Sequence, residues 1–188
     1  MKPINYDQIS DEDLVRRVVD GYSEEFSFVY DRYSHKVYSR CLSFAKGSST
    51  AQDLTHDIFI KAFINLSKFN YDSRFSTWLY SITYNYCIDF VKQLSRVAIS
   101  SEEEVPEIPE SDDNKNQEEL LKIEAHQLQL VLDMLHPKDK AILLMKYQDS
   151  MSIKEIQEAL DLNESAVKMR IKRARAKTVE FYNQYIKS

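Results

Sequence analysis

Hydrophobic residues near the C-terminus recur at helical intervals and predict a short amphipathic helix. Ile153, Ile156 and Leu160 lie three or four positions apart, which places them on one face. Ser152 and Glu155 have the spacing of a capping box, in which each side chain bonds the backbone N–H of the other residue. We therefore expect this helix to begin at Ser152.

A turn and a second helix follow. The turn is expected at residues 160–163, because Asp161 and Asn163 tolerate left-handed backbone better than other non-glycine residues. Between residues 164 and 177 there are six basic residues and one acidic residue, a local charge of +5. The inward stripe of this second helix consists of Val167, Ile171 and Ala174.

The opposite side of the second helix combines small, flexible and cationic side chains. These residues are Ser165, Met169, Lys172, Arg173 and Ala176. A helix in the DNA major groove needs small residues for close approach, and Lys or Arg for guanine edges and phosphates. A solvated basic face is the alternative, but the capped first helix and the turn favour a helix-turn-helix DNA reader.

Periodicity predicts four helices in the N-terminal half of the chain. Ser10 caps a helix through residue 19, Ser23 opens one that ends near Gly47, and two more cover residues 51–66 and 77 to about 94. The second helix should bury Phe26, Val29, Tyr30, Tyr33, Val37 and Cys41. The fourth should bury Leu79, Ile82, Tyr86 and Phe90, and present Trp78, Ser81, Asn85, Ile88 and Lys92.

Apolar periodicity stops between residues 96 and 119 and resumes from residue 120. This segment holds two basic and nine acidic residues, a charge of −7, while residues 1–95 carry −1 and residues 120–188 carry +3. Such a composition predicts a flexible acidic linker. The expected domains are therefore 1–95 and 120–188, joined by 96–119.

Composition narrows the fold class. With 188 residues the chain is long enough for two small domains, and 2 Gly and 4 Pro leave little room for hairpins or phosphate-binding loops. We expect an all-α protein. Cys41 and Cys87 lie far apart in the sequence and suit small core residues better than a zinc site or a disulfide framework.

No stretch of the sequence suits a membrane span or a leader peptide, so we expect a cytoplasmic protein without membrane insertion. The four histidines have no metal-ligand spacing, and there is no nucleophile motif. The sequence therefore predicts no catalytic residue, no metal and no cofactor.

The third predicted helix has two stripes. Leu54, Ile58, Ala62 and Leu66 form the first, whereas Asp53, Asp57, Ile60 and Ile64 lie almost opposite. Carboxylates aligned with isoleucines are typical of a docking site for another protein. Alternatively, a neighbouring helix covers the two isoleucines.

Aromatic and polar residues gather before and along the fourth helix. They are Phe69, Tyr71, Ser73, Phe75, Trp78, Asn85 and Lys92. Rings can stack on unstacked bases, an amide can read a base edge, and a cation can meet phosphate. Ordinary core aromatics are the alternative for Phe75 and Trp78.

Three stretches together resemble the extracytoplasmic-function group of bacterial RNA polymerase sigma factors. Residues 51–59 resemble the region 2 helix that docks on the polymerase clamp. Residues 75–80, with Asn85 and Asp89, resemble the segment that melts the minus-ten promoter element. Residues 135–175 resemble region 4, which reads the minus-thirty-five element.

The resemblance implies roles for these residues and partners for the chain. Core-polymerase binding falls to Asp53, Leu54, Asp57, Phe59 and Ile60. Asn85 and the loop 69–75 would capture the melted non-template strand. The minus-thirty-five element would be recognised by Ser165, Lys168, Met169, Lys172 and Arg173. Expected partners are core RNA polymerase through its clamp and flap, promoter DNA and an anti-sigma factor. The linker would thread toward the polymerase active-site and RNA-exit channels.

The chain departs from the family pattern in two places. Asp161 stands where the family usually has Gly, and Ser165-Ala166 replaces a common Gly-Thr pair. The basic run after the melting helix is reduced to Lys92 and Arg96. The rival functions are a free-standing helix-turn-helix regulator and, with little support, a helical enzyme.

Overall fold

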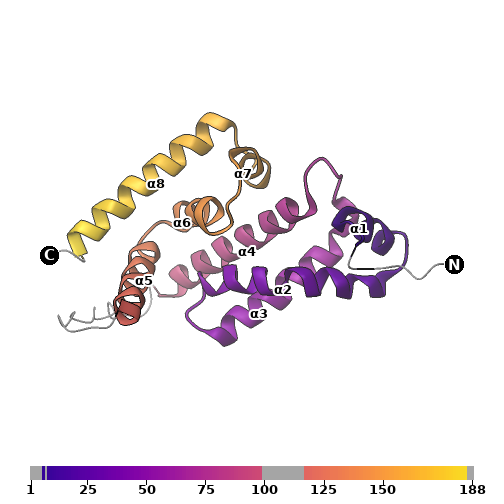
Figure 1. Ribbon diagram of the computed structural model, residues 1–188, viewed down its shortest axis with the longest axis horizontal. Coiled ribbons are helices and arrows are strands. Elements are labelled where there is room, and N and C mark those ends of the chain that lie inside the picture. Colours follow the sequence, from indigo (N-terminus) through magenta and orange to yellow (C-terminus); the bar gives the residue numbers. More distant parts are fainter. Residues whose placement is uncertain (1–5, 7, 99–116, 186–188) are drawn as a thin grey trace. The chain divides into compact units, whose positions relative to one another are not determined.

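The structure is a computed structural model that describes residue 6 and residues 8–98 and 117–185. Within these residues every regular element is a helix (Figure 1). They form two compact units, one mainly of residues up to Asp89 and the other mainly of residues from Phe90 onward. The predicted all-α class is confirmed. No described helix is both long enough and apolar enough to cross a membrane.

The N-terminal unit contains four α-helices and two short 3₁₀ turns. They are α1 (Asp11–Val19), η1 (Ser23–Glu25), α2 (Phe26–Leu42), α3 (Ser48–Ile64), η2 (Leu66–Lys68) and α4 (Phe75–Ala98). Ser10 caps α1 as predicted, since its hydroxyl accepts a 3.1 Å hydrogen bond from the Asp13 backbone N–H. In Figure 1, α2 and α3 lie side by side, and they form the main helix pair of this unit.

The end of α2 differs from the prediction. The helix stops at Leu42, not near Gly47, because the backbone tightens and the Phe44 N–H bonds the Cys41 carbonyl at 2.9 Å. This turn directs Phe44 inward, where it is 7% exposed and meets the Tyr84 ring edge-on at 6.1 Å. Of the predicted α2 stripe, four residues are buried, whereas Phe26 and Tyr30 are half-buried.

The buried face of α4 was predicted wrongly. Leu79 is buried as expected, but Ile82, Tyr86 and Phe90 are half-buried, and Ile88, expected outside, is 4% exposed. The residues that α4 buries are Phe75, Thr77, Leu79, Tyr80, Thr83, Tyr84, Cys87 and Ile88. Apolar residues lie all round this helix, so periodicity leaves its orientation open. Thr83 also tolerates burial because its hydroxyl bonds the Leu79 carbonyl at 2.9 Å.

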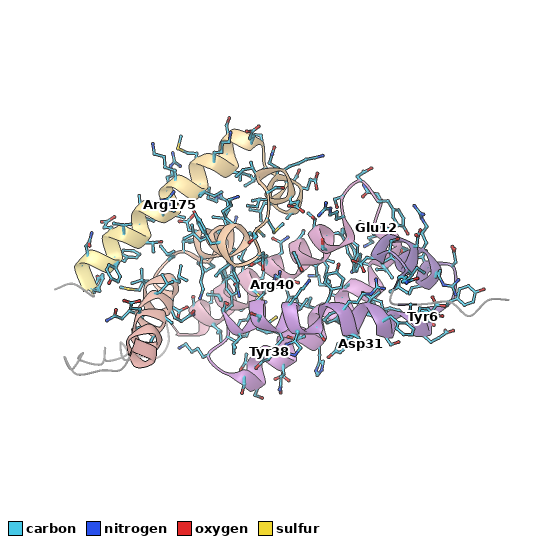
Figure 2. The ribbon with its side chains drawn as sticks, in the orientation of Figure 1. Tyr6, Glu12, Asp31, Tyr38, Arg40 and Arg175 are labelled. Atoms are coloured by element: carbon cyan, nitrogen blue, oxygen red, sulfur yellow. The ribbon has the colours of Figure 1, made fainter. Side chains whose placement is uncertain are left out.

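A residue far away in the sequence starts α4. The Phe75 backbone N–H donates a 2.9 Å hydrogen bond to the carboxylate of Glu12 on α1. A side-chain oxygen that accepts from an unpaired N–H stabilises a helix N-terminus. The helix therefore begins at Phe75, two residues before the predicted Thr77. Glu12 is labelled in Figure 2.

The C-terminal unit consists of four α-helices and one π-helical segment. They are α5 (Gln117–Asp133), α6 (Pro137–Leu143), η3 (Leu144–Gln148), α7 (Ile153–Leu160) and α8 (Glu164–Tyr185). Pro137 occupies the first turn of α6, as predicted, and the His136 imidazole caps it. Both α5 and α6 pack against α8. The core of this unit consists of Val131, Leu135, Ala141, Ile142, Leu143, Leu144, Met145, Met151, Ile156, Ala159, Val167 and Ala174.

The predicted linker, residues 96–119, overlaps the helices at both ends. The last three residues of α4 and the first three of α5 fall inside it. Its central part, 99–116, lies outside the described residues.

Candidate protein-docking and nucleic-acid interfaces

The outer face of α3 carries an exposed apolar and acidic stripe. Ile60 is 57% exposed and Ile64 is 70% exposed, and Asp53 and Asp57 are exposed beside them. No described element covers the two isoleucines, so that alternative is wrong. Phe63, which the sequence analysis missed, adds an apolar side chain that is 43% exposed. We refer to Asp53, Asp57, Ile60, Phe63 and Ile64 as the α3 face.

Two of the predicted polymerase-binding residues lie beneath this surface. Leu54 is 4% exposed and Phe59 is 3% exposed. The Phe59 ring lies 4.6 Å from the Tyr30 ring and 6.3 Å from the Phe26 ring, both on α2. These side chains fix the position of α3 from inside the unit.

The α3 face is connected to α4 by Tyr86. Its hydroxyl donates a 2.9 Å hydrogen bond to the Asp57 carboxylate, and the Lys61 ammonium lies 5.4 Å from the ring centre. Burial raises the pKa of Tyr86, and the bond to Asp57 acts in the same direction. The neighbouring Asn85 side chain is exposed.

The aromatic residues between Phe69 and Trp78 form a cluster. Phe69 and Phe75 are 3% and 0% exposed, and their ring centres are 5.7 Å apart. Trp78 lies 5.6 Å from Phe69 and 5.7 Å from Phe75, and is half-buried. Phe75 is therefore a core aromatic residue, which was the alternative to a DNA contact. Trp78 keeps part of its surface open.

The loop outside this cluster presents Tyr71. Its backbone is left-handed, with φ 63°; its ring centre lies 4.6 Å from that of Phe69 and 4.8 Å from the Arg16 guanidinium carbon. Tyr71 and Ser73 are half-buried. An aromatic ring beside a cation is a suitable platform for an unstacked base.

Three of the predicted minus-ten residues share one side of α4. Seven positions separate Trp78 from Asn85, and seven more separate Asn85 from Lys92. Seven residues are close to two full helical turns, so the three side chains lie on one side. Asn85 is exposed, while Trp78 and Lys92 are half-buried. This side of α4 offers a ring, an amide and a cation in sequence.

The first helix of the helix-turn-helix has the predicted cap. The Ser152 N–H bonds the Glu155 carboxylate at 2.8 Å, and the Glu155 N–H bonds the Ser152 hydroxyl at 3.2 Å, which is the expected capping box. Asp161 is left-handed, with φ 51°. Asn163, expected in the turn because it tolerates left-handed backbone, does not adopt that conformation. Its side chain accepts a 2.8 Å bond from the Ala166 N–H and caps the start of α8.

The α8 helix presents all five predicted minus-thirty-five residues. Ser165, Lys168, Met169, Lys172 and Arg173 are exposed, while Val167 and Ala174 face the core. Lys168 forms an ion pair with Glu164 one turn earlier, and this bond lowers the pKa of Glu164.

A groove runs along one side of α8. Its volume is about 580 Å³, and its lining consists of Lys146, Ile153, Lys168, Ile171, Lys172, Arg175, Ala176 and Val179. Four of these residues are cations. Lys146 and Arg175 were missed in the sequence analysis, although Arg175 belongs to its basic run; Figure 2 labels Arg175 on α8. Cations along a helix are suited to DNA phosphates.

Comparison with known proteins decides the family. The model for Sigma-70 region 2 matches residues 29–97, and the model for Sigma-70 region 4 matches residues 125–178. The chain belongs to the extracytoplasmic-function (ECF) group of the sigma-70 family. It is therefore an RNA polymerase sigma factor that acts in transcription initiation, and not an enzyme.

Two curated relatives extend over most of this sigma factor. The ECF RNA polymerase sigma factor SigW of Bacillus subtilis is 27% identical over 169 residues, which cover 86% of this chain and 90% of the relative. The ECF RNA polymerase sigma-E factor of Escherichia coli K12 is 29% identical over 177 residues, or 90% and 92% of the two chains. Core RNA polymerase and promoter DNA are thus its partners, which excludes a free-standing regulator.

Solved structures share the fold of this sigma factor. One is CnrH in complex with the cytosolic domain of CnrY, with a TM-score of 0.66 and 22% identity over 93% of this chain and 98% of the other. The other is the sigma factor RpoE in complex with the anti-sigma factor NepR from Bartonella quintana. It has a TM-score of 0.63 and 17% identity over 85% and 98%.

Proposed function

We propose that three separate surfaces of this sigma factor have different binding functions in transcription initiation. The α3 face binds core polymerase, the outer side of α4 with the loop 69–75 captures melted minus-ten DNA, and α8 binds the minus-thirty-five duplex. The observation that carries the proposal is the exposure of Asp53, Asp57, Ile60 and Ile64 on α3.

Polymerase docking is supported by the mixture of side chains on the α3 face. Exposed isoleucines next to carboxylates offer apolar contact area with charges that set orientation. Leu54 and Phe59 contribute by holding α3 in place from the core. The partner surface should therefore be apolar with basic residues around it.

Capture of the non-template strand is supported by Asn85 and its surroundings. Its exposed amide can hydrogen-bond the edge of a flipped base, while Tyr71 and the open part of Trp78 can stack on neighbouring bases. Each stacked base contributes roughly 1 to 3 kcal/mol, which offsets the cost of melting. Phe69 and Phe75 support the loop from below, and Lys92 can contact phosphate.

Upstream binding is supported by the α8 side chains. Ser165 and Met169 allow close approach to the major groove, while Lys168, Lys172 and Arg173 can reach phosphates or guanine edges. The cations that line the groove beside α8 extend the same positive surface.

An anti-sigma factor is a further proposed partner. Both structural neighbours described above were solved with such a protein or with a cytosolic partner domain.

A sigma factor binds core polymerase and promoter DNA in the cytoplasm, and we propose that location for this chain. The proposed path of the acidic linker toward the polymerase channels concerns mainly residues 99–116, which lie outside the described residues.

Two sets of substitutions test whether the α3 face and Asn85 have separate functions. Asp53→Lys with Asp57→Lys should weaken assembly with core polymerase, measured by co-sedimentation. Asn85→Ala should leave assembly intact and reduce open-complex formation about tenfold, the loss of one base contact. Asp20→Lys with Asp31→Lys is the matched control, because it reverses two exposed acids away from α3, one at the end of α1 and one on α2. The same defect in both sets would refute the proposal.

A further inference from the structure

The two cysteines of the chain meet inside the N-terminal unit. Cys41 lies in the last turn of α2 and Cys87 in the middle of α4, 46 positions later, yet their sulfur atoms are 4.0 Å apart. Both side chains are 0% exposed, and both are thiols. Packing of α2 against α4 therefore brings two thiols that are distant in the sequence into direct contact.

The environment distinguishes the two thiols. The Cys87 thiol donates a hydrogen bond to the Cys41 sulfur, and this bond lowers the pKa of Cys41. The Thr55 hydroxyl and the Arg40 guanidinium act in the same direction, while burial opposes them. Thiolate is the reactive form of cysteine, so this environment favours Cys41 over Cys87 as the attacking thiol.

We propose that Cys41 and Cys87 form a redox-active dithiol that hydrogen peroxide converts into a reversible internal disulfide. The Cys41 thiolate attacks one peroxide oxygen and breaks the O–O bond, which gives a sulfenic acid and hydroxide. The Cys87 sulfur then attacks the sulfenic sulfur, loses its proton and expels the hydroxyl group as water. In sum, two thiols are oxidised, and one hydrogen peroxide is reduced to two waters.

Bond closure requires a small local movement. A disulfide bond is about 2.05 Å long, so the two sulfur atoms must approach by roughly 2 Å. Cys41 belongs to the terminal turn of α2, and terminal turns open more easily than helix centres. The same opening admits a molecule as small as peroxide. Closure would tie α2 to α4 two residues from Asn85.

Mass spectrometry of the full chain tests the proposal. After peroxide treatment and acid quenching, we expect the intact monomer to lose two hydrogens, and trypsin to release peptide 41–46 joined to peptide 75–92. Dithiothreitol should restore both thiols. Cys41→Ser and Cys87→Ser should each abolish the linked peptide, and Cys41→Ser should also slow the first oxidation more than Cys87→Ser does.

Glutathione redox buffers provide a second readout that needs no variant. The effective concentration of the two thiols should be at least tenfold higher in the native chain than in the urea-unfolded chain. An equal or lower value in the native chain would overturn the proposal. So would sulfinic acid or intermolecular disulfides as the main products of peroxide treatment.

Discussion

The hydroxyl of Tyr86 on α4 donates a 2.9 Å hydrogen bond to the carboxylate of Asp57 on α3. Asp57 belongs to the proposed polymerase-docking face, and Tyr86 adjoins Asn85, the proposed reader of a flipped base. One hydrogen bond thus joins the two helices that carry these two surfaces.

Tyr86→Phe should lower the free energy of unfolding of the N-terminal unit by about 1 kcal/mol, because it removes one hydrogen bond to a charged acceptor. The single tryptophan, Trp78, lies in this unit, so urea unfolding followed by its fluorescence measures the effect. Tyr22→Phe is the matched control, since Tyr22 is 50% exposed and keeps its ring contact with Arg17. An equal loss of unfolding free energy in both variants would show that the hydrogen bond to Asp57 does not contribute to stability.

Glu25→Gln should destabilise the N-terminal unit at neutral pH, as a lower urea midpoint in the same assay. Glu25 is 4% exposed, accepts a 2.6 Å bond from the Arg17 Nε and accepts another from Tyr6 at 3.0 Å. The bond from Arg17 holds the pKa of Glu25 below its ordinary 4.5. Burial acts against this shift.

The sign of that shift sets the pH dependence. A carboxylate with a lowered pKa in the folded state stabilises the protein above its unfolded pKa, and this contribution is lost as the pH falls through the folded value. The difference in urea midpoint between wild type and Glu25→Gln should therefore be largest at pH 7 and become smaller below pH 4.5. A gap that stays constant from pH 7 to pH 3 would contradict the assignment.

Asp161→Gly should preserve the helix-turn-helix and raise its stability by up to about 1 kcal/mol, because glycine adopts a left-handed backbone without a Cβ penalty. The Leu162 N–H bonds the Gln157 carbonyl at 3.1 Å, which is the hydrogen bond of a Schellman motif around this residue. Asp161→Val should cost about 1 to 2 kcal/mol at the same φ of 51°. Thermal unfolding monitored by circular dichroism compares the two. A loss in the glycine variant would show that the Asp161 side chain has a role of its own.

Lys172→Ala with Arg173→Ala should weaken binding to minus-thirty-five duplex DNA and flatten its salt dependence. Each cation that contacts phosphate contributes about 0.9 to the slope of log K against log salt, so the slope should fall by nearly 2. Fluorescence anisotropy across a salt series measures this. Lys36→Ala removes an exposed lysine of α2 and should leave the slope unchanged.

The sequence by itself determined the local structure of this protein. The caps at Ser10 and Ser152, the turn at Asp161 and the two stripes of α3 all involve residues within a few positions of each other. Their hydrogen bonds and their helical phase depend on neighbours along the chain, so spacing predicts them. The three motifs of the sigma family are readable for the same reason.

Only the tertiary structure decided which apolar residues face inward where a helix is apolar all round. On α4 it buried Ile88 and left Tyr86 near the surface, against the predicted phase. The bonds Glu12 to Phe75, Asp57 to Tyr86 and Cys41 to Cys87 span 63, 29 and 46 positions. No local pattern encodes such partners, because they meet only when packing of the helices brings distant segments together.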